Sequence, residues 1–154
     1  MQGWLPTALG ILLIHLTAVT SGWAALGQSV ASVERDRAAM GGEGQTKPGK
    51  GYSIETITVA GMTVKEYVSS GGIVFAVSWR GTGAPDLSLL FGSYIDEYRE
   101  GLTALQHRKP RIRRPMVLKT AHMVIERAGH ARSMWGRAFI PLLLPATISP
   151  EDIR

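Results

Sequence analysis

No cysteine occurs anywhere in the 154 residues of this chain. Its absence excludes a thiol nucleophile, a thiolate ligand for a metal and a cysteine-linked lipid anchor. Disulfides are excluded as well, so the fold must be held together by its hydrophobic core. For an exported chain of this size, a core without disulfides favours a bacterial periplasm or secretion over a small eukaryotic extracellular domain.

Charged side chains are absent from the start of the chain up to Glu34. The apolar run at residues 8–19 has about 12 residues, which fits the core of a signal peptide and falls short of the roughly 18–20 that span a bilayer. In the stretch SGWAALGQ that follows, Gly22 and Ala24 occupy positions −3 and −1 of a cut between Ala24 and Ala25. We therefore predict a cleaved signal peptide, although no Lys or Arg precedes the apolar run. The alternatives are an uncleaved N-terminal anchor and a buried helix.

The chain is too short for two domains after the leader. About 130 residues remain, which is enough for one domain with a substantial core. The whole formal charge of +5 belongs to this mature part. We expect residues 1–24 to be the signal peptide, 25–40 a short N-terminal helix, 41–51 a Gly-rich flexible linker, and 52–154 a single α+β domain.

Three runs after the linker alternate with period two and are rich in Ile, Val, Thr and aromatic residues, namely 52–59, 62–68 and 73–79. The short connections between them predict an antiparallel three-stranded meander. The third run, IVFAVSW, is apolar on both faces, which is typical of a strand near the middle of a sheet. Strict alternation would place Ile73, Phe75, Val77 and Trp79 on one face and Val74, Ala76 and Ser78 on the other.

Helical periodicity is clearest after Asp86, where apolar residues recur every three or four positions as far as Leu105. Asp86 itself suits the start of a helix. A weaker helix is expected at residues 29–40, with Val30, Val33 and Met40 on its apolar stripe and Arg35 and Asp36 facing away. Two further strand-like runs follow, at 116–126 and about 131–140. The pattern predicts an α+β fold in which an antiparallel sheet of about five strands packs against one long amphipathic helix.

The segments AALGQSVASVERDRAAM, GYSIETITVAGMTVKEYVSSGGIVFAVSWRG and GHARSMWGRAFIPLLLP resemble a bacterial family known as domain of unknown function 2844. The resemblance extends from about residue 23 to residue 154, and EYVSSGGIVFAVSW and GHARSMWGRAFIP are its most specific parts. It implies an exported, single-domain protein. No catalytic or binding residues transfer with it.

His122, Glu126 and His130 recur every four residues in HMVIERAGH. On a helix such neighbours lie about 6 Å apart and could share a zinc ion, whereas on a strand they lie about 13 Å apart. The β-branched residues between them favour a strand, so we predict no metal site and no cofactor. Neither a phosphate-binding loop in RGTGAPD nor a nucleophile elbow is indicated by the spacing of glycines and serines.

The loop HRKPRIRRP is strongly basic and contains two prolines that keep it out of a helix. Its candidate polyanion-binding residues are Arg108, Lys109, Arg111, Arg113 and Arg114. Such a loop binds phosphates or an acidic partner with salt-sensitive affinity, while its alternative role is to solubilise the surface. Because the loop has no aromatic residues for base stacking, nucleic acid is not an expected partner.

Aromatic residues of the mature chain form a second candidate set, comprising Trp79, Tyr94, Tyr98, Trp135 and Phe139. Their spacing is typical of a core, with an apolar ligand groove as the alternative. Taken together, these patterns favour an exported periplasmic or secreted binding or envelope-associated domain over an enzyme. A small envelope enzyme with a site around His122 and His130 is the alternative, and membrane contact is expected only through an uncleaved leader.

Overall fold

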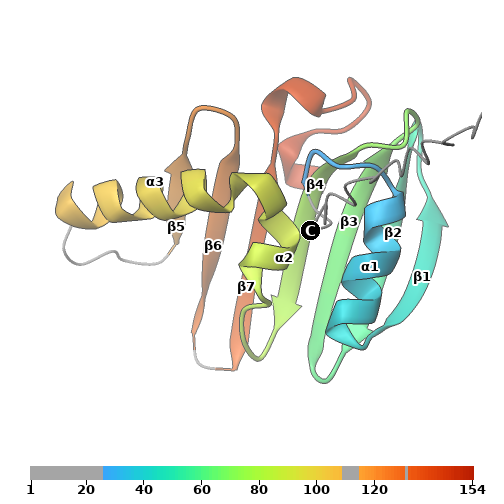
Figure 1. Cartoon of the computed structure of the whole chain (residues 1–154), viewed down its shortest axis with the longest axis horizontal. Helices are drawn as coiled ribbons and strands as arrows, with labels where there is room; N and C mark the ends of the chain where they lie inside the picture. The colour runs from blue at the N-terminus through green and yellow to red at the C-terminus, as the bar shows by residue number, and fades with distance from the viewer. Residues whose placement is uncertain (1–25, 109–114, 131) are drawn as a thin grey trace, which may run out of the picture.

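Seven antiparallel strands form one sheet in the computed structural model, which describes residues 26–108, 115–130 and 132–154. The strands are β1 (Glu43–Pro48), β2 (Tyr52–Val59), β3 (Met62–Ser69), β4 (Val74–Gly81), β5 (Met116–Lys119), β6 (Val124–His130) and β7 (Ser133–Phe139). Their order across the sheet is β1-β2-β3-β4-β7-β6-β5. Two meanders, β1–β4 and β5–β7, therefore meet where β4 pairs with β7 (Figure 1). The predicted α+β class is confirmed, with seven strands in place of about five.

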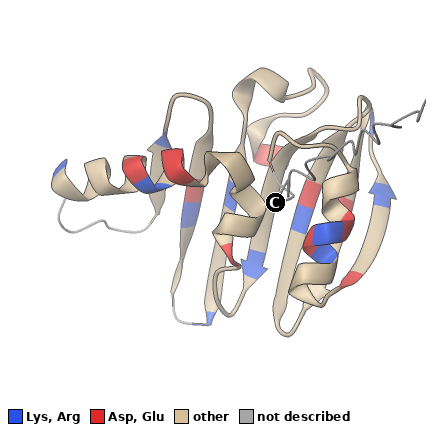
Figure 2. Cartoon of the chain, viewed as in Figure 1, with Lys and Arg blue, Asp and Glu red and all other residues tan. Residues whose placement is uncertain are grey.

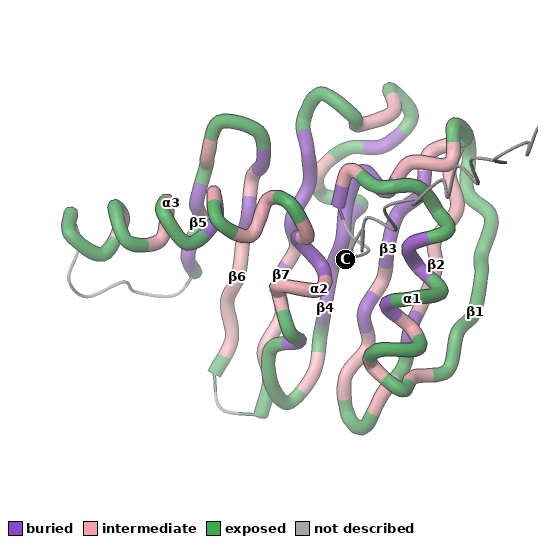
Figure 3. The backbone as a smooth tube through the Cα atoms, viewed as in Figure 1, coloured by how far each residue is buried: buried purple, intermediate pink, exposed green. Residues whose placement is uncertain are grey.

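Two strand predictions need correction. Residues 43–48, inside the segment expected to be a flexible linker, pair with β2 as the edge strand β1. All six residues of β1 are exposed, so its polar composition reflects its place at the edge of the sheet (Figure 3). The single run expected at 116–126 is instead a hairpin, because the chain turns between β5 and β6 and Thr120 closes that turn on Met123.

The helices are α1 (Ala31–Met40), α2 (Leu87–Phe91) and α3 (Ile95–Arg108), with short 3-10 turns η1 (Gly92–Tyr94), η2 (Pro141–Leu143) and η3 (Pro150–Asp152). Asp86 caps α2 as predicted, because its carboxylate accepts a hydrogen bond from the Ser88 N–H. The long helix is interrupted at Gly92, whose positive φ of 48° bends the chain between α2 and α3. None of the helices within the described ranges is long and apolar enough to cross a membrane.

Each face of the sheet has its own core. The helices pack on one face, where α2 and α3 contribute Leu90, Phe91 and Tyr98 to a cluster that includes Val77 and Ile125. The opposite face is covered by the C-terminal segment, residues 141–154, whose buried Ile148 and Ile153 pack in a second cluster with Tyr67, Phe75 and Phe139. The central strand β4 is buried along most of its length, as its two apolar faces predict (Figure 3).

A β-bulge changes the phase of β4. The register between β3 and β4 slips after Tyr67, so that Val68 pairs with Val74 while Tyr67 pairs with Ala76. Phe75 is the extra residue, and it shares the C-terminal face with Ala76. The strict alternation predicted for this strand is therefore wrong for Val74 and Phe75, because Val74 lies with Val77 and Trp79 on the helix-covered face and Phe75 lies on the opposite face.

Helix α1 presents an unexpected face to the sheet. Asp36, predicted to point away, is only 1% exposed, whereas Val30, predicted to lie on the apolar stripe, is 44% exposed. Val33, Asp36 and Met40 follow helical spacing, so the carboxyl group lies between two apolar anchors of the same stripe. The packing of α1 therefore buries a charged residue type that propensity alone would leave in water.

The segment just before α1 ties the start of the described chain to the sheet and to α2. Leu26 is fully buried and its N–H donates to the Leu90 carbonyl at 3.0 Å. The Gly27 N–H donates to the Val74 carbonyl, and the Val74 N–H donates to Gln28. Leu26 is thus a core residue that belongs to the helix-covered cluster.

Replacing Leu26 with alanine is expected to lower the free energy of unfolding by about 2–5 kcal/mol, because it leaves a cavity in a closed part of the core. Urea denaturation followed by circular dichroism measures this change. Leu142→Ala is the matched control, since Leu142 is 90% exposed and should change stability little. Equal effects of the two substitutions would contradict the assignment of Leu26 to the core.

Candidate functional site

The predicted basic loop and the predicted cleavage site lie almost entirely outside the described residues. Lys109, Arg111, Arg113 and Arg114 are not described, and neither are Ala24 and Ala25. Arg108 is the last residue of α3 and is exposed. Polyanion binding by this loop therefore stays a prediction.

The three residues of the HMVIERAGH motif do not converge. His122 lies in the turn between β5 and β6, where its N–H donates to the Glu97 carboxylate at 2.8 Å and its Nδ1 lies 2.9 Å from the same group. Glu126 pairs with Arg137 at 2.8 Å on the C-terminal face. His130 ends β6, four residues beyond Glu126 on an extended strand. Within the described part of the chain, no group of three or more His, Asp or Glu residues could hold a metal ion.

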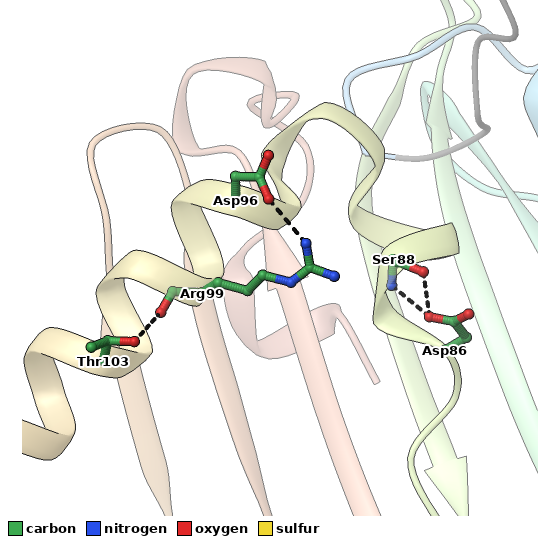
Figure 4. Close-up of polar contacts among 5 residues, drawn as sticks. All are labelled: Asp86, Ser88, Asp96, Arg99 and Thr103. Atoms are coloured by element: carbon green, nitrogen blue, oxygen red, sulfur yellow. Dashed lines mark hydrogen bonds and ion pairs between the residues drawn. The ribbon is translucent and has the colours of Figure 1, made fainter.

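Carboxylates on the helical layer have structural partners. Asp86 accepts hydrogen bonds from the N–H and hydroxyl of Ser88, and Asp96 pairs with Arg99 at 3.0 Å (Figure 4). Burial alone would raise the pKa of Glu97, but the neighbouring Thr120 and the donors of His122 outweigh it and lower that pKa. These groups stabilise helix starts and hold α3 to the β5–β6 turn, and they do not meet in a common cleft.

The aromatic set is divided between the two faces of the sheet. Trp79 and Tyr98 both pack against Phe91 in the helix-covered core, with ring centroids 6.2 Å and 5.2 Å from it. Phe139 joins the opposite cluster. Trp135 pairs with Arg80 across β4 and β7, is half-buried and lines a pocket. The predicted core role is thus confirmed for most of the set, and Trp135 is the exception.

We refer to this cavity as the Trp135 pocket. It has a volume of about 230 Å³ and lies between the end of β4, the neighbouring part of β7 and the C-terminal segment. Its principal lining residues are Ser78, Arg80, Trp135, Arg137, Ile153 and Arg154. The pocket therefore combines an aromatic wall and an aliphatic wall with several polar groups, as small-molecule sites do.

The C-terminal wall of the pocket is fixed by polar contacts. The Arg137 guanidinium donates to the Pro150 carbonyl. The Tyr67 hydroxyl donates to the main-chain oxygen of Arg154 at 2.9 Å and accepts from the Arg154 N–H at 2.8 Å. Buried Ile153 anchors the same segment to the sheet. These contacts hold the C-terminal segment against the sheet, so the wall that it provides to the pocket is already formed in the folded chain.

A second cavity of similar volume lies between α1, the edge strand β1 and its neighbour β2. Its charged groups are already paired, since Arg37 bonds to Glu34, and Glu55 accepts from Thr46 and Ser53. A cavity whose charged groups already have partners offers less to a ligand than one with an unpaired group. The Trp135 pocket is therefore the stronger candidate.

Sequence reasoning missed a pair of buried carboxyl groups. Glu66 on β3 is fully buried, and its carboxyl group interacts with that of Asp36 on α1. Figure 2 shows acidic positions on both of these elements. Burial, followed by the charge of Asp36, raises the pKa of Glu66 to about 9, and burial raises the pKa of Asp36 to about 6. The sequence did contain a signal for the burial of Glu66, because this residue lies at period two with Val64 and Val68, which point into the core. These two groups form a titrating pair within the core.

The structure as a whole defines an α+β protein with an open antiparallel sheet, helices on one face and a pocketed C-terminal cover on the other. The family model described as Protein of unknown function (DUF2844) matches residues 22–153. This chain belongs to that family, which confirms the resemblance seen in its sequence. No curated protein and no solved structure matches it.

Proposed function

We propose that this chain is an exported bacterial protein that binds a ligand in the Trp135 pocket and carries out no catalysis. The observation that carries the proposal is the convergence in one cavity of an aromatic side chain, a buried hydroxyl and several arginines. By contrast, the histidines of the alternative enzyme hypothesis lie apart, and their carboxylate neighbour Glu126 is paired with Arg137. Groups that act together in proton transfer need to be within hydrogen-bond reach of one substrate.

Export is supported by the uncharged apolar run and by the small residues Gly22 and Ala24 after it. The contacts of Leu26 and Gly27 agree with a cut between Ala24 and Ala25, because this cut leaves both residues in the mature chain. A cleaved leader would place the domain in the periplasm or outside the cell, so its ligands would be molecules of the envelope or the medium. An uncleaved leader would instead hold the same domain at the membrane.

Expression of the full-length gene in a Gram-negative host, followed by cell fractionation and intact mass measurement, tests the export step. We expect a soluble periplasmic chain that begins at Ala25. Ala24→Arg should keep the leader attached, because signal peptidase requires a small residue at position −1. Gln28→Arg adds the same charge beyond the cut and should be processed normally.

Two outcomes would overturn parts of the proposal. A full-length wild-type chain in the membrane fraction would show that residues 1–24 form an anchor. A full-length soluble chain in the cytoplasm would remove export altogether and would make nucleic acid a partner to test for the basic loop.

A further inference from the structure

Among the described residues, one of the guanidinium groups that line the Trp135 pocket has no hydrogen-bonding or ion-pairing partner. Three arginines and one glutamate, Glu151, line the pocket. The positive charge of Arg137 is neutralised by Glu126, whose carboxylate accepts two hydrogen bonds from the guanidinium at 2.8 and 3.1 Å. Arg154 uses its Nε to donate to the Glu151 carbonyl, and among the described residues the Arg80 side chain makes no ion pair or hydrogen bond. A guanidinium without a partner at the rim of a cavity favours an anionic ligand.

The position of Arg80 is set by the sheet. Arg80 and Trp135 are direct cross-strand partners on β4 and β7, so their side chains leave the same face. Ser78 lies two residues before Arg80 and therefore points to that face as well. Ser78 is only 3% exposed, and its hydroxyl forms no hydrogen bond within the described ranges. A ligand beside Trp135 would thus meet one cation and one buried hydroxyl.

The volume of the pocket limits the size of its ligand. Sites for drug-sized molecules have about 300–1,000 Å³, whereas a cavity of about 150 Å³ accepts benzene. At about 230 Å³, the Trp135 pocket fits one aromatic ring with a short substituent. A ring packs favourably against an indole face, and a guanidinium binds a carboxylate through two parallel hydrogen bonds.

We propose that the Trp135 pocket binds a small aromatic carboxylate, with its ring against Trp135 and its carboxylate on Arg80. This inference rests on the proposed function and specifies the ligand class for the same site. Ser78 donates a further hydrogen bond to the carboxylate or to a substituent of the ring. The aliphatic wall formed by Ile153 excludes water from the far side of the ring.

Isothermal titration of the purified chain with three probes tests this specificity. The probes are 3-phenylpropanoate, its neutral amide 3-phenylpropanamide and the cation 2-phenylethylamine, which share a phenyl ring on a short chain. We expect the carboxylate to bind about tenfold more tightly than the amide, because a charge-assisted pair replaces a neutral hydrogen bond, and the amine to bind most weakly. The indole N–H signal of Trp135 should shift in NMR spectra on addition of the carboxylate.

Arg80→Gln should weaken binding of the carboxylate about tenfold and so remove its preference over the amide, because glutamine can donate a neutral hydrogen bond to either probe. Arg80 is exposed, so this substitution should leave the fold intact. Arg99→Gln is the matched control, since it removes the same charge from an exposed helix position on the other side of the sheet. This control should keep the full preference.

The outcomes separate the ligand class from the proposed function. Equal affinity for the carboxylate and the amide, or a preference that survives Arg80→Gln, would overturn the carboxylate assignment and leave a binding pocket in place. Absence of binding by all three probes, with an unshifted Trp135 signal, would overturn both the ligand class and the use of this pocket.

Discussion

Replacing Glu66 with glutamine is expected to abolish most of the decline in stability that the wild-type chain shows between pH 6 and pH 9. Glu66 is fully buried on β3, under helix α1, and Asp36 is the charged group that affects its pKa most strongly. Both Glu66 oxygens, Asp36 Oδ2 and the Ser32 hydroxyl lack hydrogen-bond partners among the described residues. An ionised carboxylate in such surroundings is costly, so the folded chain retains the proton.

The direction of the pH effect follows from proton binding in the two states. Burial raises the pKa of Glu66 from 4.5 to about 9, so between these values the unfolded chain is ionised while the folded chain stays protonated. Stability is therefore greatest below pH 4.5 for this group and declines as the pH rises, until the loss is complete above about pH 9. Asp36 adds a smaller loss in the same direction, which ends near pH 6.

The size of the effect is large relative to the stability of a small domain. While the folded chain holds one proton more than the unfolded chain, the free energy of unfolding falls by about 1.4 kcal/mol for each pH unit, or roughly 4 kcal/mol over three units. Other charged groups near the pair, Glu55 on β2 and Arg35 on α1, modulate this cost. Glutamine has no proton to lose and nearly the same shape, so the unfolding free energy of the variant should change little over this range.

Urea denaturation at pH 5, 6, 7, 8 and 9 measures this dependence for wild type and variant. Glu100→Gln provides the control, because Glu100 is exposed on α3 and should leave the steep decline unchanged. A wild-type chain whose unfolding free energy is flat from pH 6 to pH 9 would show that Glu66 is ionised in the folded state. That result would contradict the burial of the pair under α1.

Gly136→Ala is expected to destabilise the fold by about 3 kcal/mol, at the upper end of the range for an overfilled core. A Cβ atom at this position would lie 2.1 Å from Cζ2 of Trp79, its direct cross-strand partner. The Trp79 ring cannot move away easily, since it is 3% exposed and packs against Phe91 of α2. The missing side chain of Gly136 thus provides the space for the indole on the helix-covered face.

Thermal and urea denaturation of Gly136→Ala and of Gly83→Ala test this expectation. Gly83 lies in the exposed loop after β4, and a Cβ there would meet no atom within 4 Å. Its replacement should be close to neutral. The double variant Gly136→Ala with Trp79→Leu should lose less stability than the sum of the two single losses, since leucine is smaller than the indole and leaves room for the added methyl group. Additive losses in the double variant would count against a direct clash.

Local patterns in the sequence were sufficient for most of the secondary structure. The period of two in residues 52–79 predicted β2, β3 and β4, and the apolar spacing after Asp86 predicted the helical segment as far as α3. These patterns work because side-chain direction repeats with a fixed period along a strand or a helix. The edge strand β1 was missed because an exposed strand carries no apolar alternation, and its glycine and proline resemble those of a linker.

Only part of the candidate site could be predicted from the sequence. Trp135 belonged to the aromatic set for which a ligand groove was the alternative, but Arg80 and Ser78 had no distinguishing motif. They become part of a site because β7 returns from the second meander to pair with β4, and because the C-terminal segment folds back over that pair. Tertiary structure also removed the support for an enzyme site around His122 and His130, because the β5–β6 turn places His122 against α3.

The sequence by itself determined the α+β class, the cysteine-free hydrophobic core and the residues that belong to the central strand β4. Only the tertiary structure decided the phase of β4 at Phe75, the burial of Asp36 against Glu66 and the convergence of Arg80 with Trp135. Periodicity reports the direction of a side chain relative to its own element, and it contains no information about which distant element lies opposite. Pockets and buried charge pairs form between distant elements, so they appear only when the strands have found their partners.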